Sequence, residues 1–237
     1  MTLRIGVLAP MKPELVPVVK AMSLERGRIG ELEVSVGRVG QADVFATMTG
    51  IGMEPAARVT AQLLDATALD HVMVVGIAGG IAPNVRLGDL LVPEVVVDER
   101  TGREYRQSPL DGGPVRGRIE SSDDLLVDKA EIARRGERGV HALDMETGAV
   151  AAVCTERGVG WSAYRAISDL AGDSAIDPEI MQLSGPDGSG NLGALARYLV
   201  RKPTRVVGLV RLTKGMRAAT NTAATAARRA IENAKVA

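Results

Sequence analysis

Three acidic residues stand where strand-like runs of apolar residues end, and carboxyl groups at such places can transfer protons. The acids are Glu14, Glu146 and Asp169, and the runs that precede them are residues 3–8, 140–143 and 161–167. Open α/β sheets bind ligands outside the carboxyl ends of their strands, so one crevice could collect all three carboxylates. Each acid also has a structural explanation, since acids stabilise the first turn of a helix and Ser or Asp often begins a loop. The pattern alone leaves both interpretations open.

A glycine-rich segment follows the apolar strand that residues 71–77 predict. Its sequence is Gly76-Ile77-Ala78-Gly79-Gly80, with three glycines in five residues, and Pro83 follows shortly after. Glycines allow the backbone to approach a ligand closely, although a bulge in a strand would use them as well. The segment is not the dinucleotide-binding fingerprint, because no helical pattern begins there. We therefore consider Ile77, Ala78 and Gly79 candidate substrate contacts.

Short apolar runs alternate with helical patterns along the whole chain. Strands are predicted at residues 3–8, 33–39, 43–48, 71–77, 90–97, 116–120, 140–143 and 161–167, and helices at 13–22, 54–64, 128–135 and 146–157. This order is typical of an α/β fold, in which a mixed, mostly parallel central sheet is flanked by helices. Polar stretches rich in glycine predict loops at 98–114 and 184–191. Neither loop is long enough to separate two domains, so we expect a single domain over 1–237.

Composition and charge exclude several classes of function. Twenty-nine basic residues balance 29 acidic ones, so no overall field favours nucleic acid as a partner. Neither His71 nor His141 has a second ligand at metal-binding spacing, and we expect no metal and no cofactor. The only cysteine, Cys154, lies in an apolar helical stretch and fits a reducing compartment. Without a leader or an apolar run of bilayer length, the chain is expected to be soluble and cytoplasmic.

The C-terminal segment at about 191–237 differs from the rest of the chain. From residue 197 onward it carries ten Lys or Arg residues against one acid, Glu232, and apolar residues interleave with these charges. One interpretation is a helix that packs its apolar side on the sheet and leaves a solvated basic face. The other is a basic amphipathic segment that contacts an anionic membrane surface, peripheral to the inner membrane.

Taken together, five segments resemble the nucleoside phosphorylase superfamily, and most of all its 5′-methylthioadenosine/S-adenosylhomocysteine nucleosidase branch. They read IGVLAPMKPEL, TGIGMEPAA, VVGIAGGIAPNVRLGDLLVP, LDMETGAVAAVC and YRAISDLAG, and they span residues 3 to about 173 in the order of the family. The resemblance implies cleavage of the N-glycosidic bond of a purine nucleoside, with adenine as the base. Since relatives complete the 5′ pocket from a neighbouring subunit, it also implies a homo-oligomer, a dimer or larger.

The resemblance also implies a role for each acid. By this resemblance Glu14 activates the attacking water, and Met145 and Glu146 hold the ribose. Asp169, which follows the substrate-binding residue Ser168, protonates the purine. This division of labour is chemically sound, because glycosidic cleavage develops positive charge on the sugar and negative charge on the departing base. Asp169 would need a raised pKa to remain protonated near neutrality.

The same residues bear on whether water or phosphate is the nucleophile. The first loop offers Lys12 as its only cation, beside Glu14, and a carboxylate next to an unneutralised phosphate is electrostatically unfavourable. Ile77 stands where relatives carry Ser or Thr, and the strand before it has no Arg. We expect a hydrolase, with a phosphate-dependent phosphorylase as the alternative and a non-catalytic nucleoside-binding protein as a third class.

Two departures from the nucleosidases bear on the substrate. Their helix between the segments that match residues 97 and 118 is replaced here by a polar stretch, and Leu125 falls near their purine-stacking Phe. The C-terminal third, with GPDGSGNLGALARYL and RKPTRVVGLVRLTKGMRAA, is similar to the hopanoid-associated phosphorylase family. That resemblance implies adenosylhopane, a lipid-linked nucleoside, as the substrate; methylthioadenosine or S-adenosylhomocysteine is the alternative.

Overall fold

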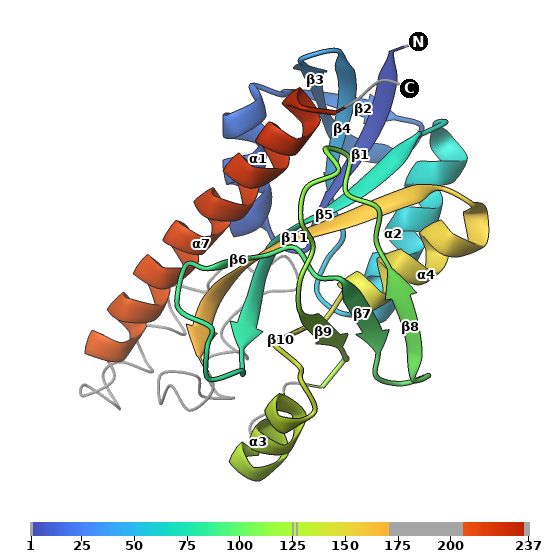
Figure 1. Cartoon of the computed structure of the whole chain (residues 1–237). Coiled ribbons are helices and arrows are strands. Elements are labelled where there is room, and N and C mark those ends of the chain that lie inside the picture. The colour runs from blue at the N-terminus through green and yellow to red at the C-terminus, as the bar shows by residue number, and fades with distance from the viewer. Residues whose placement is uncertain (1, 125, 127, 171–205, 235–237) are drawn as a thin grey trace.

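Four parallel strands form the centre of the molecule (Figure 1). In the computed structural model, which describes residues 2–124, 126, 128–170 and 206–234, they lie side by side in the order β4, β1, β5 and β11. Their bounds are Ala42–Met48, Leu3–Ala9, His71–Gly80 and Gly160–Leu170. Valine, isoleucine, leucine and alanine fill these strands and are buried on both faces, as a sheet covered by helices requires.

Shorter strands extend this centre on both sides. An antiparallel pair, β2 (Glu25–Ile29) and β3 (Leu32–Val39), continues the sheet beyond β4. On the other side β10 (Ala142–Asp144) is antiparallel to the end of β5 and is followed by β9 (Arg118–Ser121), β7 (Val95–Asp98) and β8 (Arg103–Arg106). A two-residue strand, β6 (Leu90–Leu91), pairs with β11. Because β10 and β11 both pair with β5, the ends of these strands meet at one place.

Helices cover both faces of the sheet (Figure 1). α1 (Lys12–Met22) and α7 (Val206–Glu232) pack on one face, where alanines of α7 fill a core with the valines of β1 and β4. α2 (Met53–Ala66) and α4 (Thr147–Arg157) pack on the other. α3 (Lys129–Glu137) lies at the end of the molecule to which the β5 arrow points. The predicted α/β fold with a mixed central sheet between helices is confirmed.

The prediction of a loop over residues 98–114 is wrong in part. Asp98 is the last residue of β7, and residues 103–106 form β8, antiparallel to it. The Asp98 carboxylate accepts hydrogen bonds from the backbone N–H of Arg100 and from the Thr101 hydroxyl, which fixes a tight turn. One side chain of β8, that of Tyr105, is buried, and the other three residues are exposed, so the strand resembles a polar loop in sequence.

Two further predictions need adjustment at their edges. The strand predicted to end at Ile77 continues to Gly80, so the glycine-rich segment belongs to β5. The run 90–97 is divided into β6 and β7 around Pro93, which has no N–H for a ladder. The predicted loop 184–191 lies outside the described residues. The basic segment is described from residue 206, where it forms α7, and the buried alanines of this helix pack on the sheet.

Candidate active site

Glu14 reaches from the first turn of α1 to the backbone of β5. Its Oε2 accepts the backbone N–H of Met11 at 2.8 Å, and its Oε1 accepts the N–H of Ile77 at 2.8 Å. The carboxyl group is buried. A Cβ atom on Gly76 would lie 2.2 Å from Oε1 of Glu14, so this approach is possible only because residue 76 is glycine. The glycine-rich segment therefore admits a buried carboxylate rather than a phosphate-binding helix.

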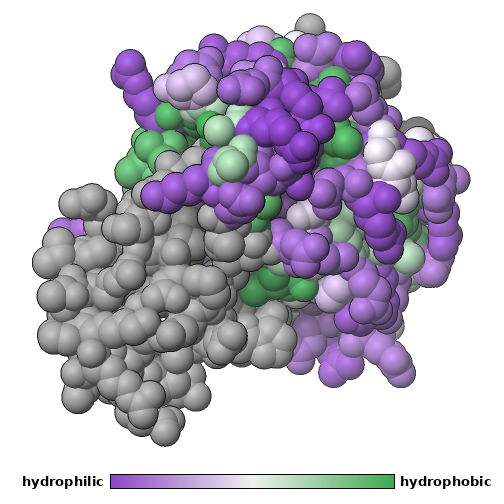
Figure 2. Space-filling view, turned by 90° about the horizontal axis from the view of Figure 1, so that it is seen from below, coloured by the Kyte–Doolittle hydropathy of each residue, from purple (hydrophilic) through white to green (hydrophobic). Residues whose placement is uncertain are grey.

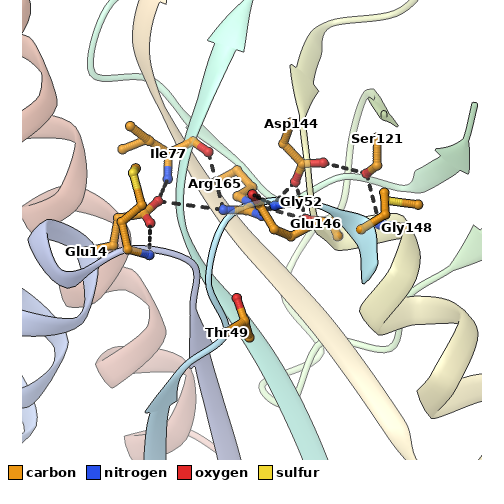
Figure 3. Close-up of polar contacts among 12 residues, drawn as sticks. Glu14, Thr49, Gly52, Ile77, Ser121, Asp144, Glu146, Gly148 and Arg165 are labelled. Atoms are coloured by element: carbon orange, nitrogen blue, oxygen red, sulfur yellow. Dashed lines mark hydrogen bonds and ion pairs between the residues drawn. The ribbon is translucent and has the colours of Figure 1, made fainter. Parts of the chain in front are cut away.

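Arg165, in the middle of β11, joins three carboxylates from different parts of the chain (Figure 3). Its side chain has no solvent exposure, and its Nη2 lies 2.8 Å from Asp144 Oδ2 and 3.1 Å from Glu146 Oε2. Its Nη1 lies 3.8 Å from Glu14 Oε1. Its remaining N–H groups donate to the Thr147 hydroxyl and to the carbonyl of Ile77. The cluster thus holds three acids and one guanidinium.

Two hydroxyl groups support Asp144, one on each oxygen of its carboxylate. Ser121, at the end of β9, and Thr147, at the start of α4, both donate short hydrogen bonds to its carboxylate. The N–H of Gly148 donates in turn to the Ser121 oxygen at 2.9 Å. The carboxylate of Asp144 is buried, and each of its two oxygen atoms accepts a hydrogen bond.

Glu146 precedes α4 and faces the beginning of α2. Its Oε1 accepts the backbone N–H of Gly52 at 3.1 Å. The next N–H of α2, that of Met53, donates to Asp123 at 2.7 Å. Both carboxylates lie at a helix N-terminus, where unpaired N–H groups favour anions. The side chain of Glu146 is thus held between Arg165 and α2.

Asp169 lies at the same end of the sheet, four residues beyond Arg165. β11 shifts its register against β5 between Ile167 and Asp169, so Ser168 is an extra residue in a β-bulge. The shift aligns Asp169 with Gly79, and a Cβ atom there would lie 3.1 Å from Asp169 Oδ2. The Ser168 hydroxyl donates to Oδ1 of Asp169. The glycine again leaves room for a carboxylate beside β5.

Burial has a large effect on the acids around Arg165. Removal from water raises the pKa of Glu14 to about 8, against the opposing influence of Arg165, and Glu146 adds to the rise. Burial likewise raises the pKa of Glu146 to about 7, where Arg165 lowers it and Asp144 raises it. The guanidinium of Arg165 thus does not offset the desolvation of Glu14 and Glu146. Near neutrality the cluster therefore holds protons that exposed carboxyl groups would have lost.

The structure brings several of the predicted residues together. Glu14, Glu146 and Ile77 meet at Arg165, while Ala78, Gly79, Ser168 and Asp169 lie further along β5 and β11. Met145 is half-buried between β10 and α4. Leu125 lies outside the described residues. The described ranges contain no group of three or more His, Cys, Asp or Glu that could hold a metal ion.

Sequence reasoning gave too little weight to two residues of this cluster. Asp144 and Arg165 are not among the site residues that the sequence predicts, whereas the structure pairs them at 2.8 Å. An arginine within an apolar strand was the available signal, because a buried guanidinium needs carboxylates around it. Ser121 and Asp123 gave no comparable signal in the sequence.

The family model described as "Phosphorylase superfamily" matches residues 4–126 and 111–201. Among curated proteins, the 5′-methylthioadenosine/S-adenosylhomocysteine nucleosidase of Geobacillus sp. (strain WCH70) is 31% identical over 204 residues, which cover 72% of this chain and 87% of the relative. The protein of that name from Tolumonas auensis is 26% identical and covers 83% of this chain and 100% of the relative. This chain belongs to the phosphorylase superfamily.

Solved structures share the fold. The S-adenosylhomocysteine nucleosidase of Streptococcus pyogenes, in complex with 5-methylthiotubericidin, superposes with a TM-score of 0.74 at 18% identity and covers 99% of this chain and 98% of the other. The futalosine hydrolase of Helicobacter pylori gives 0.70 at 18% identity, with 98% and 97% covered. The relatives are nucleosidases, which are N-glycosyl hydrolases, and this confirms the enzyme class that the sequence predicts.

Proposed function

We propose that this protein hydrolyses the N-glycosidic bond of an adenine nucleoside and releases the free base. The observation that carries the proposal is the buried cluster in which Arg165 joins Glu14, which follows the parallel strand β1, and Glu146, which follows β10. Ligands of open α/β sheets bind at this edge. The names of the relatives support the substrate class, since they act on 5′-methylthioadenosine and S-adenosylhomocysteine.

In the proposed reaction each acid has one task. Glu14 takes a proton from water, whose oxygen bonds to C1′ of the ribose as the bond from C1′ to the purine nitrogen breaks. Asp169 gives its proton to N7 of the departing base, so the base leaves without negative charge. Glu146, with Met145 beside it, holds the ribose hydroxyls and stabilises the positive charge that develops on the ring. The space between these three acids is lined by Ile77, Ala78, Gly79 and Ser168.

Water is the proposed nucleophile because acidic side chains line the position of the attacking group. Phosphate would have to approach Glu14, and the guanidinium beside it, that of Arg165, is already bonded to Asp144 and Glu146. Lys12 of the same loop is exposed. A second anion in this buried region would meet repulsion at low dielectric.

The test is a panel of adenine nucleosides, assayed for free adenine with and without phosphate. We expect adenine and free ribose products in phosphate-free buffer, at a rate that phosphate does not raise. A rate that depends on phosphate, with a sugar phosphate as product, would establish the phosphorylase instead. Tight binding of nucleosides without any release of adenine would leave the non-catalytic alternative.

For the group at the 5′ position we propose a lipid, as in adenosylhopane. The carbonyl of Ser168, next to Asp169, lies 2.9 Å from where a Cβ atom on Gly215 would be, so α7 passes the end of β11 at this point. Lys214 and Arg217 are exposed on either side of Gly215. Seen from this end, hydrophobic residues reach a largely polar surface in small groups (Figure 2). A basic helix beside the site suits a substrate held in an anionic membrane.

Vesicles decide between a lipid and a small 5′ group. We expect binding to anionic vesicles at low salt, loss of binding when Lys214 and Arg217 are replaced by Gln, and faster cleavage of a lipid-linked nucleoside than of methylthioadenosine. The reverse preference, with no vesicle binding, would assign methylthioadenosine or S-adenosylhomocysteine. Within the described residues, no helix has the length and hydropathy to cross a bilayer. We propose a homo-oligomer as in the relatives, which light scattering of the purified protein tests.

A further inference from the structure

We propose that Asp144 is a positioning residue that occupies the charge of Arg165 and thereby leaves one proton shared between Glu14 and Glu146 in the ligand-free enzyme. This inference rests on the proposed function, since it concerns the groups that would meet water and ribose. Asp144 itself contacts Ser121 and Thr147 beside Arg165.

The contacts of Asp144 all favour its ionised form. Two hydroxyl groups and the guanidinium of Arg165 donate to it, the last at 2.8 Å, and its side chain is 1% exposed. A guanidinium and hydroxyl groups that donate hydrogen bonds to a carboxylate stabilise its negative charge. Asp144 therefore offsets the one positive charge of the cluster.

Glu14 and Glu146 are less well supported as anions. Glu14 accepts two backbone N–H groups and lies 3.8 Å from Arg165, and Glu146 accepts one backbone N–H and lies 3.1 Å from it. With all three acids ionised, the cluster would carry three negative charges and one positive charge, in a region that is buried from solvent. The raised pKa of both residues agrees with a retained proton.

The other charged groups around the pair do not supply a further cation. From β10 the pair faces Asp144, and from β11 it faces Arg165, with Asp169 four residues on. From the segment after β9 comes Asp123, which is bonded to the N–H of Met53 at the start of α2. Of these four groups of the described residues, three are acids, and the fourth is Arg165 itself. The proton has to leave before Glu14 can accept one from water, so the rate should rise with pH.

The decisive variant is Asp144→Asn, which keeps the size of the side chain and removes its charge. Arg165 would then neutralise the glutamates, and the acidic limb of the kcat/KM profile should move to lower pH by about one to three units. Ser121→Ala is the matched control, because it removes one donor to Asp144 and leaves the charge in place. A uniform loss of rate, with the limb unmoved, would show that Asp144 is only structural.

Infrared spectroscopy detects the retained proton directly and does not require enzymatic activity. In an Asp169→Asn background, which removes the contribution of that acid, the band of a protonated carboxyl should disappear between about pH 6 and pH 9. Asp144→Asn should lower its midpoint, and Glu14→Gln should abolish it or lower it. An unchanged band in Glu14→Gln would overturn the proposal even if Asp144→Asn did not fold. An inactive wild-type enzyme that still showed this band would refute the proposed function alone.

Discussion

Two arginines of this molecule are each surrounded by three acids, yet the two clusters behave in opposite ways. Arg165 meets Glu14, Asp144 and Glu146, whereas Arg135 of α3 pairs with Glu99, Glu120 and Glu131 at 2.7, 3.1 and 2.8 Å. Hydrogen bonds from Arg135 lower the pKa of Glu131, while burial raises the pKa of Glu14 and Glu146.

Access to water explains the contrast. The side chain of Arg165 is 0% exposed, but Glu99 at Arg135 is 40% exposed, and Arg138 approaches Glu120 at 3.9 Å as a second cation. Solvated acids release their protons to water, and a nearby guanidinium stabilises the resulting carboxylates at little cost, whereas ionisation of buried acids also requires their desolvation. The composition of a charged cluster therefore does not reveal whether it can do chemistry; its burial and its ratio of charges do.

The largest expected difference between the clusters is in activity. Glu14→Gln should lower kcat for adenine release about 100- to 10,000-fold, because the amide cannot accept a proton from water. Glu99→Gln, the matched change at Arg135, should leave kcat unchanged. Comparable losses in the two variants would mean that the Arg165 cluster has no special role in the reaction.

The next effect concerns the space that the buried cluster needs. Gly76→Ala places a methyl group 2.2 Å from Glu14 Oε1 and should lower the free energy of unfolding by about 1–3 kcal/mol, with loss of activity. Gly136→Ala in α3 is the control, since its methyl group meets only the Ile81 carbonyl at 3.4 Å and replaces a helical glycine. Urea denaturation of both variants measures the difference, and an equal stability of the two would contradict the geometry.

The pH dependence of stability gives a smaller effect with a defined sign. The pKa of Glu14 rises from 4.5 to about 8 on folding, so the folded state binds more protons than the unfolded state between these values. This contribution is complete below about pH 4.5 and is lost as the pH rises through about 8, with a slope of at most about 1.4 kcal/mol per pH unit for one proton. Denaturation of Glu14→Gln between pH 6.5 and 8 should show a flatter decline than that of the wild type.

His71 acts in the opposite direction and must be separated from this effect. Burial lowers its pKa from 6.5 to about 4, so its contribution to stability is present above pH 6.5 and is lost as the pH falls toward 4. His71→Gln should remove that acid-side loss while the decline between pH 6.5 and 8 remains. A wild-type protein whose stability rises from pH 6.5 to 8 would argue against protons in the Arg165 cluster.

The smallest effect is expected at the exposed end of the second cluster. Glu99→Gln removes a half-exposed ion pair and should lower the free energy of unfolding by about 0.2–1 kcal/mol, less at high salt. Urea denaturation at two salt concentrations measures it. A loss of several kcal/mol, independent of salt, would show that the Arg135 cluster is as desolvated as that of Arg165.

The sequence predicts the parts of this fold that depend on local pattern. The apolar runs of β1, β5 and β11 are visible as such, because strands that are buried on both faces consist mostly of apolar residues. β8 is not visible, since an edge strand that buries one side chain looks polar.

The candidate site divides in the same way. Glu14 and Glu146 could be chosen from their places after strands, but the role of Asp144 depends on Arg165, which is 21 residues away and on another strand. The periodicity of apolar residues in the sequence does not reveal a contact between side chains on two different strands. The raised pKa of the glutamates likewise depends on solvent exclusion by α1, α2 and α4 together, which is a property of the assembled layers.

The bulge in β11 determines to which face of the sheet the side chain of Asp169 points. In the regular part of the strand Ala163 and Ile167 point to one core layer and Ala166 to the other. The extra residue, Ser168, exchanges odd and even, so Asp169 is aligned with Gly79 and not with Gly80. A regular register through this point would align Asp169 with Gly80 and would turn its carboxyl group toward the side of Ile167. The irregularity in β11 thus decides which residue of β5 lies opposite the carboxyl group of Asp169.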